Sequence, residues 1–187
     1  MDRRSGMTAL RRSLYAAPLA AVIIVGGAGI SGAAQAPANP TVPKELKVPA
    51  GNVLSSSFQA HGVQIYQCTA GKWVFLEPAA SLTGKTVAGN GGTLDVLHFR
   101  GPSWESVQDG SLVEGTLAAS VPSPTPGTIP QLLVRATKTQ GNGLLGHVTF
   151  VQRIATKGGA APAGSCAGTR VLSVKYTAVY RFYNAGS

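Results

Sequence analysis

The sequence has little charge and few cysteines. Charged residues make up 12% of its 187 residues, hydrophobic residues make up 44%, and there are two cysteines. So much apolar content with so little charge excludes a disordered protein, because burial can offset the entropy of the chain. Two cysteines exclude a disulfide-framework miniprotein and a zinc site made of four thiolates. The 24 glycines have no three-residue period, which excludes collagen. The length fits one domain of ordinary size with tails.

Residues 1–34 have the order of an export signal. Four arginines precede an uncharged run over 14–30, and small residues follow up to Ala36. A run of 17 residues rich in Ala and Gly is short of the ~20 strongly apolar residues of a spanning helix. We therefore expect cleavage, after Ala34 or Ala36, and favour Ala34 because Pro37 directly follows the second position. The prediction is a secreted, periplasmic or cell-envelope protein with no transmembrane segment after cleavage.

A glycine motif within this segment resembles a cofactor site. Gly27, Gly29 and Gly32 follow a buried-strand pattern with the G-x-G-x-x-G spacing of dinucleotide-binding proteins. That site needs a helix directly after the glycines, and prolines at 37, 40 and 43 interrupt the stretch. No acidic residue closes a second strand about 20 residues further on to hold the ribose. The sequence therefore predicts no nicotinamide cofactor, and no other cofactor.

The positive charge of the mature chain is spread thinly. Removal of residues 1–34 leaves 12 basic and 6 acidic residues, a net charge of +6 with neutral histidines. The basic residues form no run and no ladder with aromatic residues, so nucleic acid is excluded as a partner. Weak attraction to anionic envelope polymers or lipids is the most that this charge supports. A small extracellular ligand is the other partner that we consider.

The mature chain is dominated by strand patterns. Apolar and polar residues alternate clearly over 171–183, where positions 172, 174, 176, 178, 180 and 182 share one face. Turn clusters separate the candidate strands, and one helical turn is expected around 78–82. About seven strands predict an antiparallel sandwich or a partly closed barrel. We expect a Pro-rich lead-in over 35–48 and a single all-β domain over 49–187. The candidate strands are 63–68, 73–77, 93–99, 111–121, 131–138, 145–156 and 171–183.

The two cysteines are expected to pair. Cys68 ends one strand and Cys166 lies in a Gly- and Ala-rich loop before the last strand. In an exported protein a disulfide is the usual state of such a pair. Closing a loop of 98 residues stabilises the folded chain by ~4 to 5 kcal/mol in the loop-closure picture. A catalytic thiol is the competing interpretation, although no third cysteine is present.

The densest cluster of polar and aromatic residues runs from His98 to Ser111. His98 with Glu105 or Asp109 could form an oriented general base, because a carboxylate fixes the tautomer of an imidazole. Ser103 or Ser111 would then be the nucleophile, but neither lies in a G-x-S-x-G turn. In the structural alternative, which we favour, Gly101-Pro102 and Asp109-Gly110 are turns and Trp104 belongs to the core.

Other residues suggest binding. His61, His98 and His147 could supply three metal ligands, although none of them is spaced as a local pair. Strand aromatic residues could line an apolar pocket or fill the core. Gln64, Gln67 and Gln152 at strand positions either tie strands together or face a ligand, and both possibilities stay open. The candidate ligand-binding residues are His98, Trp104, Ser111 and Tyr66.

A series of motifs in fixed order carries a family resemblance. They are GVQIYQC at 62–68, WVF at 73–75, PA at 78–79, HFRGPSW at 98–104, DGS at 109–111, IP at 129–130, LL at 132–133, VQRI at 151–154, Thr156, GG at 158–159, AP at 161–162, Cys166, YTAVY at 176–180 and FY at 182–183. Over about 42–183 the chain resembles the secreted bacterial and fungal proteins of domain of unknown function 3455. It departs from that pattern at Gln131, where Trp is expected, and at Ala155, where Asn is expected. Gln131 argues against an aromatic ligand wall at that spot.

The resemblance implies where to look and names no ligand. It places a recurrent motif at His98, Gly101, Pro102, Trp104, Asp109, Gly110 and Ser111. Malate dehydrogenase, a label attached to some fungal relatives, needs a nucleotide-binding strand-loop-helix unit, and the mature chain of about 150 residues has none.

Three functions stay open. The first, which we favour, is a non-catalytic binding or envelope-associated module that uses the His98 to Ser111 loop and nearby aromatic residues. The second is an extracellular enzyme with His98 and Glu105 or Asp109 as acid and base, acting on a small or carbohydrate-like substrate. The third is metal binding through the histidines.

Overall fold

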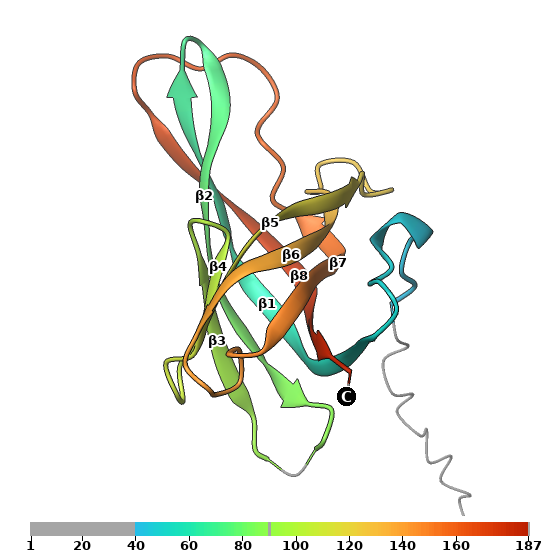
Figure 1. The fold of residues 1–187 in the computed structure, drawn as a ribbon. Coiled ribbons are helices and arrows are strands. Elements are labelled where there is room, and N and C mark those ends of the chain that lie inside the picture. The colour runs from blue at the N-terminus through green and yellow to red at the C-terminus, as the bar shows by residue number, and fades with distance from the viewer. Residues whose placement is uncertain (1–39, 90, 187) are drawn as a thin grey trace, which may run out of the picture. The chain divides into compact units, whose positions relative to one another are not determined.

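The computed structural model describes residues 40–89 and 91–186. The predicted export signal, its cleavage site and its glycine motif lie outside these residues. Eight antiparallel strands form a closed barrel in which each strand pairs with the next and the last pairs with the first (Figure 1). No helix among the described residues has the length and apolar character needed to cross a membrane. The elements are the 3-10 helix η1 (Lys44–Leu46) and the strands β1 (Asn52–Thr69), β2 (Lys72–Thr86), β3 (Leu94–Phe99), β4 (Ser103–Ser106), β5 (Leu112–Val121), β6 (Gln131–Gln140), β7 (Val148–Gly158) and β8 (Val171–Ala185).

The all-β, antiparallel fold class is confirmed, and the sheet is a fully closed barrel. The strand that the sequence pattern did not indicate is β4, whose four residues are too few to display a period of two. The helical turn expected around 78–82 was wrong, because these residues belong to β2. There Pro78 and Leu82 are buried and Ala79, Ser81 and Thr83 are exposed, which is the alternation of a strand with one inward face.

The alternation along β8 builds the core. Tyr176, Ala178, Tyr180 and Phe182 are all buried and point into the barrel, as the period-two pattern predicts. Phe182 meets Phe58 of β1 edge to face, with ring centroids 5.6 Å apart. Such pairs add to the stabilisation that burial of each ring provides.

The lead-in covers the outside of the sheet. Leu46 of η1 is completely buried, and its carbonyl accepts a 2.6 Å hydrogen bond from Nε2 of Gln152 on β7. The hydroxyl of Tyr183 donates to the other end of the Gln152 amide. Gln152 therefore ties the lead-in to the outer face of β7, and does not face the interior. The packed part of the chain thus begins before residue 49.

The disulfide between Cys68 and Cys166 is present, as predicted. It lies where the β1–β2 hairpin and the start of β8 extend beyond the other strands, at the top of Figure 1. Backbone hydrogen bonds from Cys166 to Gly71 and from Cys68 to Arg170 support the same junction. The long segment between β7 and β8 is thereby attached to the hairpin.

Candidate functional site

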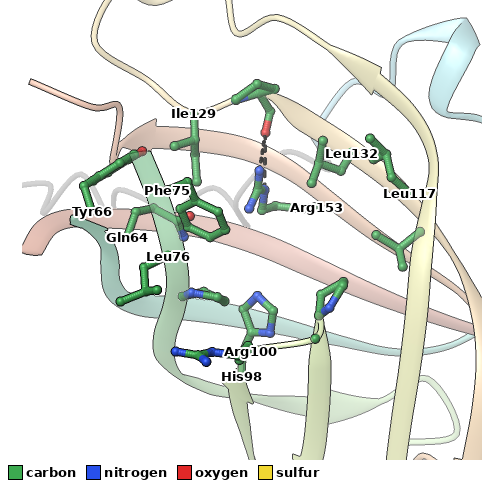
Figure 2. A pocket seen from close by; sticks show the side chains of 15 residues that line it. Gln64, Tyr66, Phe75, Leu76, His98, Arg100, Leu117, Ile129, Leu132 and Arg153 are labelled. Atoms are coloured by element: carbon green, nitrogen blue, oxygen red, sulfur yellow. Dashed lines mark hydrogen bonds between the residues drawn. The ribbon is translucent and has the colours of Figure 1, made fainter. Parts of the chain in front are cut away.

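One end of the barrel contains a cavity of about 570 Å³ (Figure 2). Its wall is formed by β1, β2, β3, β5, β6 and β7 together with the β3–β4 and β5–β6 connections. Most of the lining is apolar, and the polar side chains are few. The apolar residues are Tyr66, Phe75, Leu76, Pro78, Pro102, Leu117, Ile129, Pro130, Leu132 and Val134, and the others are Gln64, His98, Arg100, Gly101 and Arg153.

Strand alternation directs these side chains inward. Gln64 follows Phe58 and Ala60 at even positions of β1, on the face that builds the core. Arg153 of β7 is the cross-strand partner of Leu132 on one side and of the core residue Tyr180 on the other. Directly paired residues point to the same face of a sheet, so Arg153 enters the barrel.

His98 lies at the floor of the cavity as a neutral acceptor. It is 4% exposed, and its ring stacks on Trp104 with centroids 4.6 Å apart. Nδ1 is 2.9 Å from the carbonyl oxygen of Ser103. Because a carbonyl can only accept, Nδ1 carries the proton and Nε2 has a free lone pair. Burial lowers the pKa of His98 to about 3, and the nearby charge of Arg153 lowers it further against the opposing hydrogen bond to Ser103.

Arg153 brings a positive charge into the cavity. Its Nε and Nη2 both donate to the carbonyl of Pro130, at 3.2 and 3.0 Å. Within residues 40–89 and 91–186 no carboxylate forms an ion pair with it; the ion pairs are Arg100 with Glu77 and Lys138 with Glu114. Burial raises the pKa of Tyr66 and of Tyr176, and the charge of Arg153 opposes this rise. For His98, burial lowers the pKa and the charge of Arg153 acts in the same direction.

Gln64 is a buried amide with an unused donor. It is 3% exposed, and Nε2 makes no hydrogen bond of good geometry to any described residue. Donation by the Gln64 amide lowers the pKa of Tyr176 against the larger effect of burial, so one N–H group of Nε2 is directed at the Tyr176 hydroxyl and the other has no partner among the described residues. An unsatisfied buried donor is costly, roughly 1 to 3 kcal/mol, so its position needs an explanation.

A glycine makes this arrangement possible. Gly159 has a φ of +84°, and a Cβ there would lie 2.8 Å from the Tyr176 Cβ and 3.2 Å from the Gln64 side chain. The hydroxyl of Tyr66 donates a 2.7 Å hydrogen bond to the Gly159 carbonyl. The absence of a side chain at Gly159 thus lets Gln64, Tyr176 and Ile129 meet at one side of the cavity.

The structure does not bring the predicted acid and base together. Glu105 pairs with Leu97 and Leu112, out of phase with Trp104, and therefore lies on the outer face of β4. Asp109 accepts hydrogen bonds from the amides of Ser111 and Leu144, both at 2.9 Å. These bonds, with the nearby Ser111 and Ser106 hydroxyls, outweigh the effect of burial, which raises the pKa of Asp109, and lower it to about 2. Among the described residues no carboxylate orients the His98 ring.

The other predicted site residues fall into two groups. His98 and Tyr66 line the cavity, and Trp104 lies behind His98 as its stacking partner. Ser111 does not line the cavity: its hydroxyl accepts the amide of Leu145. Ser103 contributes its carbonyl to His98.

The three histidines do not form a metal site. His61 and His147 are exposed, whereas His98 is inside the barrel. No group of three His, Cys, Asp or Glu side chains in the part of the chain that the structure describes could hold a metal ion.

Arg153 is a residue of the cavity that the sequence pattern did not indicate. Its strand was predicted over 145–156, but which side chains of that strand face inward was not. Register shifts at Val148/Phe150 and at Ile154/Lys157 interrupt the pairing of β7 with β8. Val151 and Arg153 consequently point into the barrel. The sequence does contain one indication: Gln152 and Arg153 are adjacent in a strand, and because successive side chains point to opposite faces, one of the two must face inward.

No curated protein and no solved structure matches the sequence. The model of a family described as "Protein of unknown function (DUF3455)" matches residues 49–184. This match spans most of the chain and confirms the resemblance that the ordered motifs indicate. The chain therefore belongs to the DUF3455 family of proteins of unknown function.

Proposed function

We propose that this domain binds a small, largely apolar molecule in the cavity at the end of its barrel. The single observation that carries the proposal is the cavity itself, about 570 Å³ in volume with ten apolar side chains and few polar ones in its wall. Ligand pockets in proteins typically measure 300 to 1,000 Å³ and have this composition. Barrels of eight strands are wide enough to enclose one small ligand.

The lip of the cavity supports the proposal. Phe75, Leu76 and Leu117 are large apolar side chains, yet they are 50%, 37% and 57% exposed. Phe75 and Leu76 on β2 lie on one side of the opening, and Leu117 on β5 lies on the opposite side (Figure 2). The free energy of binding becomes more favourable by about 25 cal/mol for every Å² of such apolar surface that a ligand removes from water.

In this proposal only the first part of the His98 to Ser111 loop contacts the ligand. Only His98, Arg100, Gly101 and Pro102 of that segment line the cavity. The rest of the segment forms β4 and the turn that Asp109 stabilises. We further propose that the domain acts outside the cytoplasm, where its disulfide is stable.

The test is direct binding of 1-aminoanthracene, a neutral apolar fluorophore, to the wild-type protein and to Leu117→Trp. A tryptophan at the lip narrows the opening, and we expect it to weaken binding by roughly tenfold or more. Leu97→Trp is the matched control, because Leu97 is similarly exposed on β3 but lies outside the cavity wall. It should bind as the wild type does. The proposal is wrong if the wild type does not bind the probe, or if the two variants bind it equally.

A further inference from the structure

We propose that the ligand carries a single carboxylate, or a head group of the same charge, and that Arg153 and Gln64 hold this head inside the barrel. The inference rests on the proposed function and adds the chemical class of the ligand. The polar groups that line the cavity carry this inference.

Arg153 supplies the charge. Its guanidinium is anchored to the Pro130 carbonyl through Nε and Nη2, which leaves other N–H groups of the fork for a second partner. A half-buried cation without a carboxylate is costly to keep in an apolar wall. A bound anion would compensate this charge, and the planar guanidinium suits a planar carboxylate.

Gln64 supplies a second donor. Its Nε2 is buried and makes no hydrogen bond of good geometry to a described residue, so a ligand oxygen would satisfy the N–H group that is not directed at Tyr176. Figure 2 shows the ends of Gln64 and Arg153 both reaching into the cavity, from β1 and β7. The two residues also share surroundings: Gln64 meets Ile129 at Gly159, and Arg153 holds the carbonyl of the next residue, Pro130.

The remaining polar groups do not compete for this head. The Tyr66 hydroxyl is already engaged with Gly159, and Arg100 is paired with Glu77 at 3.0 Å. Nε2 of His98 is an acceptor, which would repel a carboxylate oxygen and suits a water or a ligand hydroxyl. The head therefore lies with Arg153 and Gln64, away from His98.

The charge count indicates a monoanion. No acidic residue lines the cavity, and Arg153 is its one cation without a carboxylate partner among the described residues. A phosphate dianion would exceed the charge available, and an ammonium head would be repelled by Arg153. The apolar body of the ligand then extends along Leu132 and Leu117 towards the lip.

The experiment is calorimetric titration of octanoate, 1-octanol and octylammonium into the wild-type protein. The three probes share one chain and differ in the charge of the head. We expect octanoate to bind roughly ten- to a hundredfold more tightly than 1-octanol, as one charge-assisted contact would give. Octylammonium should bind more weakly than 1-octanol.

Arg153→Gln should remove this preference. Octanoate affinity is expected to fall to that of 1-octanol, while 1-octanol affinity stays within about threefold of wild type. Arg153→Lys, which keeps the charge, should restore part of the difference. Arg135→Gln is the matched control, because Arg135 is exposed on β6 outside the cavity wall, and it should keep the wild-type preference.

Gln64→Glu provides a second variant that does not disturb the anchor at Pro130. The new carboxylate would pair with Arg153 and repel an anionic head, so octanoate should lose its advantage. Gln59→Glu, exposed on the same strand, is the control and should bind like the wild type.

Two failures are distinguishable. If 1-octanol and octanoate bind the wild type equally, or if Arg153→Gln weakens both alike, the anion site is wrong and the apolar pocket stands. If neither compound binds and 1-aminoanthracene does not bind either, the proposed function is wrong as well.

Discussion

His98 owes its protonation state to its position inside the barrel. The ring is stacked on Trp104, its Nδ1 donates to Ser103, and burial with the charge of Arg153 lowers its pKa to about 3. A histidine in solution, with a pKa near 6.5, would be protonated in mildly acidic conditions. In such conditions the unfolded chain binds a proton at His98 and the folded protein does not, so stability depends on pH.

The protein should lose stability as the pH falls below about 6.5. Between this value and about 3 the unfolded chain binds a proton at His98 that the folded chain does not bind. The contribution is roughly 1 to 1.5 kcal/mol per pH unit, so at pH 4.5 the free energy of unfolding should be about 2 to 3 kcal/mol lower from this residue alone. Urea unfolding at a series of pH values measures this slope.

Other groups also titrate in this range, so the comparison is between variants. His98→Asn should lower the slope between pH 6 and pH 4, whatever it does to stability at pH 7. His147→Asn removes an exposed histidine and should leave the slope unchanged. Equal slopes for the wild type and His98→Asn would mean that His98 is protonated in the folded protein.

Two residue-scale predictions concerned local contacts, and the geometry agrees with both. Asp109 bonds the amide of Ser111 two residues later, as an Asx-type turn does, and Trp104 is buried in the core. The turn depends on residues that are neighbours in the sequence, and the burial of Trp104 depends on the hydrophobicity of its side chain. The inward direction of Arg153 depends on strand pairing, and the sequence pattern did not indicate it.

At the scale of elements, η1 contributes more than its three residues suggest. It buries Leu46 against the outer face of the barrel and satisfies the amide of Gln152. Leu133, Ile154 and Val179, on the outward-facing side of β6, β7 and β8, are buried as well. The family match begins at residue 49 and does not include this cover.

Leu46→Ala should destabilise the protein by about 2 to 3 kcal/mol, because it removes a fully buried side chain and leaves a cavity. The midpoint of urea unfolding measures the loss. Leu97→Ala, at a side chain that is 46% exposed, should change stability by no more than about 0.5 kcal/mol. An unchanged midpoint for Leu46→Ala would show that the lead-in does not stabilise the barrel.

The strand β7 shows how an element departs from a simple period. Its residues alternate regularly between 151 and 154, but register shifts on either side change how it joins β8. The alternation could be predicted from the sequence. Which of the two faces turns inward is decided by pairing with β6 and β8, where Leu132 and Tyr180 are the partners of Arg153.

At the scale of the whole molecule, the barrel is closed by the pairing of β1 with β8, two strands from opposite ends of the chain. The disulfide joins the same two regions, across 98 residues of sequence. The folded state therefore depends on contacts between residues far apart in the sequence, and forming them costs chain entropy. The disulfide lowers this cost because it restricts the unfolded chain.

Replacement of both cysteines by serine should lower the free energy of unfolding by about 3 to 5 kcal/mol, given the length of the closed loop. Unfolding in urea with and without a reducing agent measures the effect. The reductant should destabilise the wild type and leave the double variant unchanged. If reduction does not move the wild-type midpoint, the cross-link does not contribute to stability.

Seven of the eight strands could be predicted from the sequence, because period-two alternation and turn residues are local properties, and the disulfide could be predicted because the two cysteines allow one pairing. The closure of the sheet and the cavity depend on how the strands pair. Gln64, His98 and Arg153 are distant in sequence, on β1, β3 and β7, and only the strand register places them in one cavity. Register depends on the summed pairing of every strand in the barrel, which no single segment of the sequence contains.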